Sequence, residues 1–343
     1  MANHDLIVVG GSAGSLEVLQ ATVAKLPATL PASVLIAIHT SPTGGSQLPE
    51  LLGHHSALPA SYPTHEERIE RGRVYVAPPD NQLLVRRGTM QVVRGPRENG
   101  HRPAVDALFR TASSSYGSRV IGVVLSGYQD CGTAGMISIK SRGGLGIVQN
   151  PDTASVPEMP RKVLSRVAVD YVIEPDGLAD LLVELASLAA PTASKDVLDP
   201  AIRQLEGKEL GTRAELVCPS CQGVLTESQN GLFHHFRCHV GHAFSLDSLI
   251  REQGDGLERA LWAAVRSLEE SAALSGRLAT MGSGQLRARF AEKARTQCVQ
   301  ADLIRQILVG GESAFRTTDA AFAEEAETGE PAGTPTPPPS ERE

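Results

Sequence analysis

Near its N-terminus the chain reads Leu6-Ile-Val-Val-Gly10-Gly-Ser12-Ala-Gly14-Ser15-Leu16. An apolar run that ends in glycines is typical of a buried strand, and the pattern from Leu16 to Lys25 predicts a helix. A Gly-x-Ser-x-Gly turn between strand and helix exposes the serine on a sharp bend at the helix N-terminus. Ser12 is therefore a candidate nucleophile whose oxyanion the nearby N–H groups would stabilise. The alternative is a phosphate-binding turn, although Ser12 occupies the place of the second glycine in the dinucleotide-binding pattern.

Downstream of this turn, strand-like and helix-like segments alternate. Apolar runs lie at 34–38, 74–77, 120–125, 146–149 and 171–173, and helical patterns lie at 104–116, 133–141 and 177–189. The alternation predicts an α/β fold, a doubly wound and mostly parallel sheet with helices on both faces. A β-hairpin is expected over 83–86 and 90–94. We expect this first domain to span 1–190 and a linker to follow over 191–213.

Composition narrows the class of protein. The chain has 343 residues and a formal net charge of -7, which argues against a general nucleic-acid surface. Its sequence contains no uninterrupted apolar run of the ~18 residues that a membrane span needs, and its first residues lack the basic region of a secretory signal. We therefore expect a cytoplasmic protein with no membrane insertion and no nucleic-acid partner.

Polar residues follow three of the predicted strands. Ser12 follows the first, His39 follows the run at 34–38, and Asp130 with Cys131 follows the run at 120–125. Because ligands bind at the carboxyl ends of parallel strands, these side chains can converge there as nucleophile, base and orienting acid. Each also has a structural interpretation, since His39 can cap a strand and Asp130 can cap the helix that follows it.

Several segments in this order resemble the catalytic domain of the chemotaxis protein-glutamate methylesterases (CheB type). The resemblance covers about residues 5 to 185 and rests on the turn at Ser12 and on these further segments: Ile38-His39, Ser46-Gln-Leu-Pro-Glu-Leu-Leu52, Gly72-Arg-Val-Tyr-Val-Ala-Pro-Pro-Asp80, Gly95-Pro-Arg-Glu-Asn99, His101-Arg-Pro-Ala-Val-Asp106, Asn150-Pro-Asp152 and Met159-Pro-Arg161. It implies that Ser12 is the nucleophile and His39 the base. It also implies hydrolysis of glutamyl methyl esters on chemoreceptor helices through a serine acyl-enzyme, with glutamine deamidation as a second activity. Relatives usually carry a preceding receiver domain, and the sequence shows none.

The third catalytic position departs from the family pattern. The family segment usually reads Leu-[Ser/Thr]-Gly-x-x-x-Asp-Gly, whereas this chain reads Leu125-Ser-Gly-Tyr-Gln-Asp-Cys-Gly132. Cys131 therefore stands where the catalytic Asp is expected, and Asp130 lies one residue earlier. We take Asp130 as the third catalytic residue. The alternative is a catalytically weakened module that binds receptors or acts as a scaffold in a chemosensory pathway.

A Cys/His module is expected over 214–250. The spacing Cys218-x₂-Cys221-x₁₆-Cys238-x₃-His242 predicts a zinc site with these four ligands, and His239 is the alternative fourth ligand. Four protein ligands leave no open coordination position, so the zinc would be structural, and none is expected in catalysis.

Two amphipathic stripes predict a helical hairpin over 255–312, with apolar faces for packing or for other chemosensory proteins. Its stripes are Leu257, Leu261, Val265, Leu268 and Ala272, and Leu286, Phe290, Ala294, Ile304 and Leu308. The segment 321–343 is rich in Glu, Pro, Thr and Gly and is expected to be disordered.

Overall fold

The computed structural model describes residues 3–41, 47–86, 88–191, 203–204, 209, 211–231 and 233–310. The chain divides into two compact units, one ending at Ile250 and the other beginning at Arg251. Most of the expected linker over 191–213 and all of the tail over 321–343 lie outside the described residues. None of the helices in the described ranges has both the length and the apolar character that crossing a bilayer requires.

The first unit is built on a seven-stranded sheet in the order β3-β4-β2-β1-β7-β8-β9. Every neighbouring pair in it is parallel, which confirms the doubly wound fold class. The strands are β1 (Leu6–Gly11), β2 (Ser33–Ile38), β3 (Ala60–Ser61), β4 (Val74–Val76), β7 (Val120–Val124), β8 (Leu145–Gln149) and β9 (Tyr171–Ile173). The chain adds strands to one side of β1 and then to the other, and ligand sites of open α/β sheets lie at such a point.

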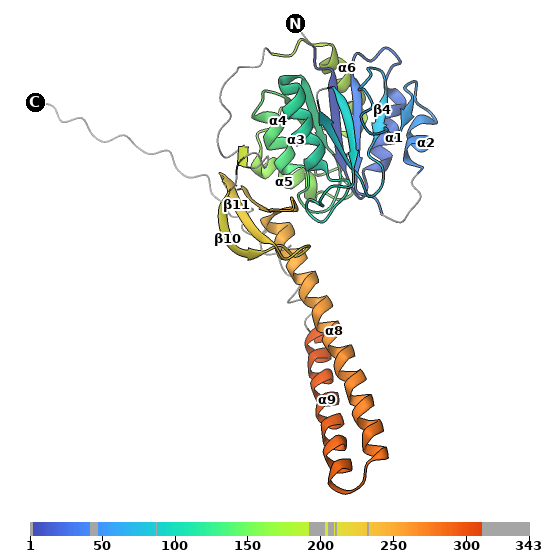
Figure 1. Cartoon of the computed structure of the whole chain (residues 1–343). Helices are drawn as coiled ribbons and strands as arrows, with labels where there is room; N and C mark the ends of the chain where they lie inside the picture. The colour runs from blue at the N-terminus through green and yellow to red at the C-terminus, as the bar shows by residue number, and fades with distance from the viewer. Residues whose placement is uncertain are drawn as a thin grey trace, which may run out of the picture. The chain divides into compact units, whose positions relative to one another are not determined.

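Helices cover both faces of this sheet (Figure 1). One face carries α1 (Leu16–Lys25), α2 (Leu48–Gly53) and α6 (Leu178–Ser187), and the other carries α3 (Val105–Tyr116), α4 (Thr133–Lys140) and α5 (Glu158–Arg166). Successive side chains of β1 enter opposite layers, as expected for a strand. Ile7 and Val9 pack in the first layer, and Leu6 and Val8 pack in the second.

A glycine allows α3 to approach the central strand closely. A Cβ atom on Gly10 would lie 2.1 Å from Cγ1 of Val105, the first residue of α3. The predicted hairpin is confirmed as β5 (Gln82–Arg86) paired antiparallel with β6 (Thr89–Val93). It is joined to α3 by hydrogen bonds, such as the one from Val85 N–H to Thr111 Oγ1 at 3.0 Å.

The Cys/His region forms a four-stranded antiparallel sheet within the same compact unit. Its strands are β10 (Thr212–Val217), β11 (Val224–Asn230), β12 (Phe233–Cys238) and β13 (Ala243–Ser245). Its core is small, with Leu225, Phe236, Phe244 and Leu249 as the main buried side chains outside the cysteines. So few apolar contacts predict that the sheet depends on a further constraint for its stability.

The predicted helical hairpin corresponds to α8 (Leu246–Met281) and α9 (Gly284–Gly310), and α8 begins earlier than the expected position 255. Glu269 lies against Arg305 and Ser271 against Gln297, so the two helices run antiparallel. The seam between the helices buries one apolar set, which is Val265, Ala301 and Leu308 with Leu261, Leu268 and Ile304 alongside. Leu257 and Leu286, which were expected on these stripes, are about half exposed.

Candidate active site and metal site

Ser12 and His39 leave neighbouring strands at the same edge of the sheet. β1 and β2 stay in register as far as the pair Gly11 and Ile38, and Ser12 and His39 are the next residues on each strand. The N–H of His39 donates to the carbonyl of Gly11 at 3.3 Å, which extends the pairing by one step. Both residues are partly exposed. The two parallel strands therefore bring the candidate nucleophile and the candidate base to the same edge.

Hydrogen bonds fix the turn at Ser12 on two sides. Its N–H donates to the carbonyl of Ser126 at 2.9 Å, and its carbonyl accepts the buried hydroxyl of Ser15 at 2.6 Å. Gly14 has a φ of 76°, and a Cβ there would lie 2.6 Å from the Cβ of Ser155. The turn therefore requires glycine at position 14, and the serine at position 15 stabilises it.

The loop after β7 lies directly against this turn. A Cβ on Gly127 would stand 2.7 Å from the Cβ of Ser12 and 2.2 Å from the sulfur of Met159. Ser126 Oγ donates to the carbonyl of Ala13 at 2.7 Å and accepts the N–H of Val156 at 2.9 Å. The turn after β1 and the loop after β7 therefore form one hydrogen-bonded structure.

Some backbone N–H groups near Ser12 already have acceptors. The N–H of Gly127 donates to the carbonyl of Val156 at 3.0 Å, and the N–H of Gln129 donates to the Glu158 carboxylate at 2.9 Å. Among the hydrogen bonds of the described chain, none is donated by the amides of Ala13 and Gly14. The turn itself therefore offers N–H groups near the Ser12 hydroxyl.

The imidazole of His39 stacks on a second imidazole, that of His101. The ring centroids are 3.6 Å apart and the planes differ by 10°. His101 Nε2 also lies 3.3 Å from Oε1 of Gln129, in the loop after β7. His101 lies in a segment that resembles the family, but it follows none of the predicted strands and was not expected in the site. Its closeness to His39 is a tertiary contact between residues 62 positions apart in the sequence.

Asp130, the expected third member, is buried and turned toward the Cys/His module. Burial raises the pKa of its carboxyl to about 6, and a hydrogen bond with the Ser245 side chain on β13 acts in the opposite direction. Its carbonyl accepts the N–H of Thr133, the first residue of α4, at 3.1 Å. These contacts connect Asp130 to β13 and to the start of α4.

Cys131 is fully buried against the N-terminus of α3. It interacts with the backbone of Val105 and Asp106, and burial raises the pKa of its thiol well above the ordinary value. A neutral thiol cannot balance the positive charge of an imidazolium as a carboxylate does.

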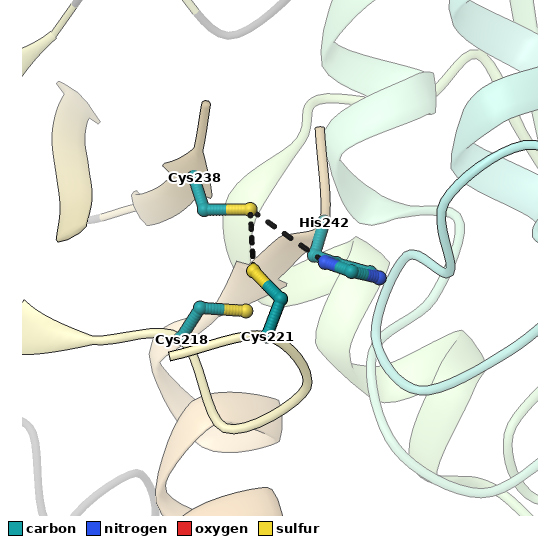
Figure 2. Close-up of side chains that lie close together, drawn as sticks. All are labelled: Cys218, Cys221, Cys238 and His242. Carbon is teal, nitrogen blue, oxygen red and sulfur yellow. Dashed lines mark hydrogen bonds between the residues drawn. The ribbon is translucent and has the colours of Figure 1, made fainter. Parts of the chain in front are cut away.

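Four side chains of the module meet at one point, and Figure 2 shows them together. The ligand atoms of Cys218, Cys221, Cys238 and His242 all lie within 4.8 Å of one another. Cys238 Sγ is 3.6 Å from Cys221 Sγ and 3.6 Å from His242 Nδ1. A tetrahedral zinc ion with bonds of about 2.3 Å to sulfur holds its sulfur ligands about 3.8 Å apart, so the spacing fits. This cluster can hold a metal ion.

Two tight turns present these ligands. Gln222 N–H donates to the carbonyl of Cys218 at 2.7 Å, and Gly241 N–H donates to the carbonyl of Cys238 at 2.9 Å. His239, the alternative fourth ligand, packs instead beside Gly223, where a Cβ would meet its ring at 2.6 Å. The geometry therefore favours His242 over His239.

Comparison with known proteins identifies one family. The family model for CheB methylesterase matches residues 7–182. A Leptospira interrogans protein, provisionally named protein-glutamate methylesterase/protein-glutamine glutaminase, is 34% identical over 184 residues, which cover 53% of this chain and 95% of that protein. A Methanosarcina acetivorans protein named protein-glutamate methylesterase/protein-glutamine glutaminase 2 is 33% identical over 192 residues. That match covers 54% of each chain, so this chain spans about half the length of that relative.

A solved structure has the same fold. The crystal structure of the Thermotoga maritima CheB methylesterase catalytic domain superimposes with a TM-score of 0.51 and 29% sequence identity. It covers 54% of this chain and 100% of that domain. About the C-terminal half of this chain, which contains the module and the helical hairpin, lies outside the region that matches the family.

Proposed function

The chain belongs to the CheB methylesterase family, and from this we propose that it is a carboxylic ester hydrolase acting on glutamyl methyl esters of chemoreceptors. Glutamine deamidation is the proposed second activity, because the names of the relatives carry both. The observation that carries the proposal is the placement of Ser12 and His39 on adjoining ends of β1 and β2.

In the proposed mechanism Ser12 Oγ attacks the ester carbonyl carbon while His39 accepts the hydroxyl proton. The carbon–methoxy bond then breaks, and the leaving oxygen takes that proton from His39 and departs as methanol. A water molecule, deprotonated by His39, attacks the acyl-enzyme and releases the glutamate carboxylate and the Ser12 hydroxyl. Backbone N–H groups of the turn after Ser12 stabilise the oxyanion in both steps.

The orienting group for His39 is the part of the mechanism in which this chain differs from its family. Asp130, the third residue expected from the sequence, contacts Ser245 of β13. We propose instead that His101 orients His39 by stacking on it, with Gln129 beside it. Removal of the acid from a related triad lowers the rate about 10⁴-fold while leaving catalysis measurable, so a slower enzyme is expected.

Methanol release from a methylated chemoreceptor tests the function. Ser12→Ala is expected to abolish release, and Asp130→Asn is expected to retain it, because Asp130 lies toward the module. Ser165→Ala is the matched control, because Ser165 is an exposed serine whose hydroxyl donates to the carbonyl of Lys162 within its own helix. Equal release by wild type and Ser12→Ala would refute the serine mechanism.

The alternative function is a receptor-binding module with weakened catalysis. The burial of Cys131 as a neutral thiol favours it, since no acid occupies the family position. Wild-type protein that binds methylated receptor and releases no methanol from it would establish this alternative.

We propose that the Cys/His cluster binds one zinc ion in a structural role. Support comes from the closeness of the four ligand atoms and from the small core of the module. Metal analysis of the full chain is expected to give about one zinc per chain. Cys218→Ser is expected to lose the metal, and Cys298→Ser, which changes an exposed cysteine on α9, is expected to keep it. Metal retained after Cys218→Ser would contradict this site.

A further inference from the structure

His101 is presented by a tight turn of four residues, Glu98 to His101. The N–H of His101 donates to the carbonyl of Glu98 at 2.9 Å, and the N–H of Glu98 donates to the carbonyl of His101 at 3.2 Å. Asn99 and Gly100 are both left-handed, with φ of 51° and 78°, as in the turns that close two-residue hairpins. The His101 ring leaves this turn and stacks on His39. The position of the turn therefore sets the position of the imidazole pair.

The Cys/His module holds the tip of this turn. The backbone N–H of Asn99 donates to the carbonyl of Ala243 on β13 at 2.8 Å, and Ala243 N–H donates to the carbonyl of Arg97 at 3.3 Å. The side-chain oxygen of Asn99 accepts two further bonds, from Ser245 N–H at 2.9 Å and from Ser248 Oγ at 2.8 Å. Asn99 is only 4% exposed, so these bonds form away from water.

The other end of the Asn99 amide reaches the catalytic domain. Its Nδ2 donates to Asp106 Oδ2 at 2.9 Å, and Asp106 Oδ1 accepts the N–H groups of Gly132 and Gly135 around the start of α4. Asn99 thus connects the module to the loop that follows β7. An amide that accepts on one side and donates on the other can make this connection, whereas a carboxylate would repel Asp106.

Charged contacts join the module to the same region. Glu98 is buried and forms two hydrogen bonds with Arg110 of α3, at 2.5 and 2.9 Å, and Arg237 of β12 lies 3.9 Å from it. Lys162 of α5 pairs with Asp247 at the start of α8 at 2.5 Å. The module therefore makes several buried or partly buried contacts with the catalytic domain.

The metal ligands lie next in the chain to these contacts. His242 immediately precedes Ala243, and its carbonyl accepts the N–H of Cys238 at 3.0 Å. An ion bound by Cys238 and His242 would hold β13 against β12 at the residues that bond to Asn99.

We infer that the Cys/His module positions the catalytic histidine pair through Asn99, so that the metal-bound module orders the turn that stacks His101 on His39. This inference rests on the proposed function for its catalytic consequence. Asn99 is a positioning residue, because its side chain bonds to Asp106, Ser245 and Ser248 and acts on His39 only through the turn. The family model matches residues 7–182, so Asn99 and His101 lie inside the matched region, whereas the strands β12 and β13 of the module lie beyond it.

The test uses the full chain and the variant Asn99→Gly. Glycine keeps the left-handed backbone and its N–H while it deletes the amide side chain. Glu66→Gly is the matched control, since Glu66 is an exposed left-handed residue with a φ of 66°. Asn99→Gly is expected to lower kcat for methanol release about tenfold to a hundredfold with KM nearly unchanged, and Glu66→Gly is expected to leave both at wild-type values.

Two readouts are independent of activity. Hydrogen–deuterium exchange over 98–101 is expected to accelerate in Asn99→Gly, in Ser248→Ala and in wild type stripped of metal by a chelator. The ring-current-shifted NMR signals of His39 and His101 are expected to move toward those of unstacked histidine in the same samples. Unchanged exchange and unchanged ring signals in metal-free wild type and in Ser248→Ala would overturn the inference, even if Asn99→Gly failed to fold. If wild type releases no methanol, the proposed function fails, and the exchange and NMR results still decide whether the module orders the histidine pair.

Discussion

Gly127→Ala is expected to impair both catalysis and stability, because the added methyl group meets the nucleophile turn and the core at once. The added methyl group would lie 2.2 Å from the sulfur of Met159 and 2.7 Å from the Cβ of Ser12. Carbon atoms in contact are normally about 3.5–4.0 Å apart, so one neighbour must move by about 1 Å. Met159 is fully buried, and Ser12 lies on a turn held by hydrogen bonds from both sides. The strain is therefore divided between the core and the nucleophile.

The magnitude follows from these distances. Overpacking of this kind lowers the free energy of unfolding by about 1–3 kcal/mol. Displacement of a reacting group by about 1 Å lowers the rate about hundredfold. We expect Gly127→Ala to show both effects, the first in urea unfolding and the second in kcat for methanol release.

Gly122→Ala is the matched control in β7, the strand that precedes this loop. A Cβ at Gly122 would lie 2.5 Å from Cδ1 of Ile139 and 3.4 Å from the Cε of Met136, in the core beside α4. It is expected to lose a similar 1–3 kcal/mol, roughly, and to keep kcat near the wild-type value. If both variants were folded and had similar kcat values, the loop after β7 would not constrain Ser12. That result would refute the role of Ser12 as a nucleophile positioned by this loop.

The remaining predictions concern single contacts. Cys131→Asp returns a carboxylate to the family position, so methanol release per folded molecule is expected to stay the same or rise. The free energy of unfolding at pH 7 is expected to fall by about 3 kcal/mol, because the new charge is buried beside Asp106. A variant as stable as wild type in urea would contradict the burial. Ser15→Ala deletes the hydrogen bond to the Ser12 carbonyl. It is expected to lower the free energy of unfolding by about 1 kcal/mol and to lower kcat several-fold. Unchanged unfolding and unchanged kcat would contradict this prediction. Burial alone would raise the pKa of Glu98, but the charge and hydrogen bonds of Arg110 outweigh it and lower the value from 4.5 to about 2. Because the folded-state pKa is lowered, this stabilisation of about 3 kcal/mol is present above pH 4.5 and is lost as the pH falls toward 2. When the free energy of unfolding is measured against pH, Glu98→Gln is expected to lack this acid-induced loss of stability. A dependence on pH parallel to that of wild type would count against the prediction.

The fold could be predicted because its strands are buried on both faces. A run such as Val120–Val124 has no polar side chain, which is typical of a parallel strand between two helical layers. The helices that the sequence analysis did not predict have weaker signals. α2 has six residues with a proline near its start, and α5 contains Pro160 and is mostly polar. Tertiary packing, rather than local pattern, decides that these segments are helical.

The candidate site could be predicted only where strand ends define it. Ser12 and His39 follow directly from their strands, so parallel pairing brings them to one edge. Asp130 lies several residues beyond β7, in a loop where Gln129 adopts a φ of 70°. Such a residue reverses the chain locally, and sequence spacing then no longer indicates which way the next side chain points. The dipeptide Asn99-Gly100 was a visible turn signal, but its two partners on β13 and α8 lie about 146 and 149 residues away in sequence.

The absence of an acid at position 131 and the presence of the module affect the same imidazole. A serine hydrolase needs its histidine held in one orientation, and a carboxylate normally does this through a hydrogen bond. Here Cys131 packs against α3 and Asp130 faces β13, so neither residue of the loop supplies that bond in the described structure. Stacking on His101 fixes the plane of the His39 ring, but it brings no charge to stabilise an imidazolium. Since stacking depends on close approach, its value for catalysis is set by how firmly the turn from Glu98 to His101 is held, and the module provides the hydrogen bonds that hold its tip.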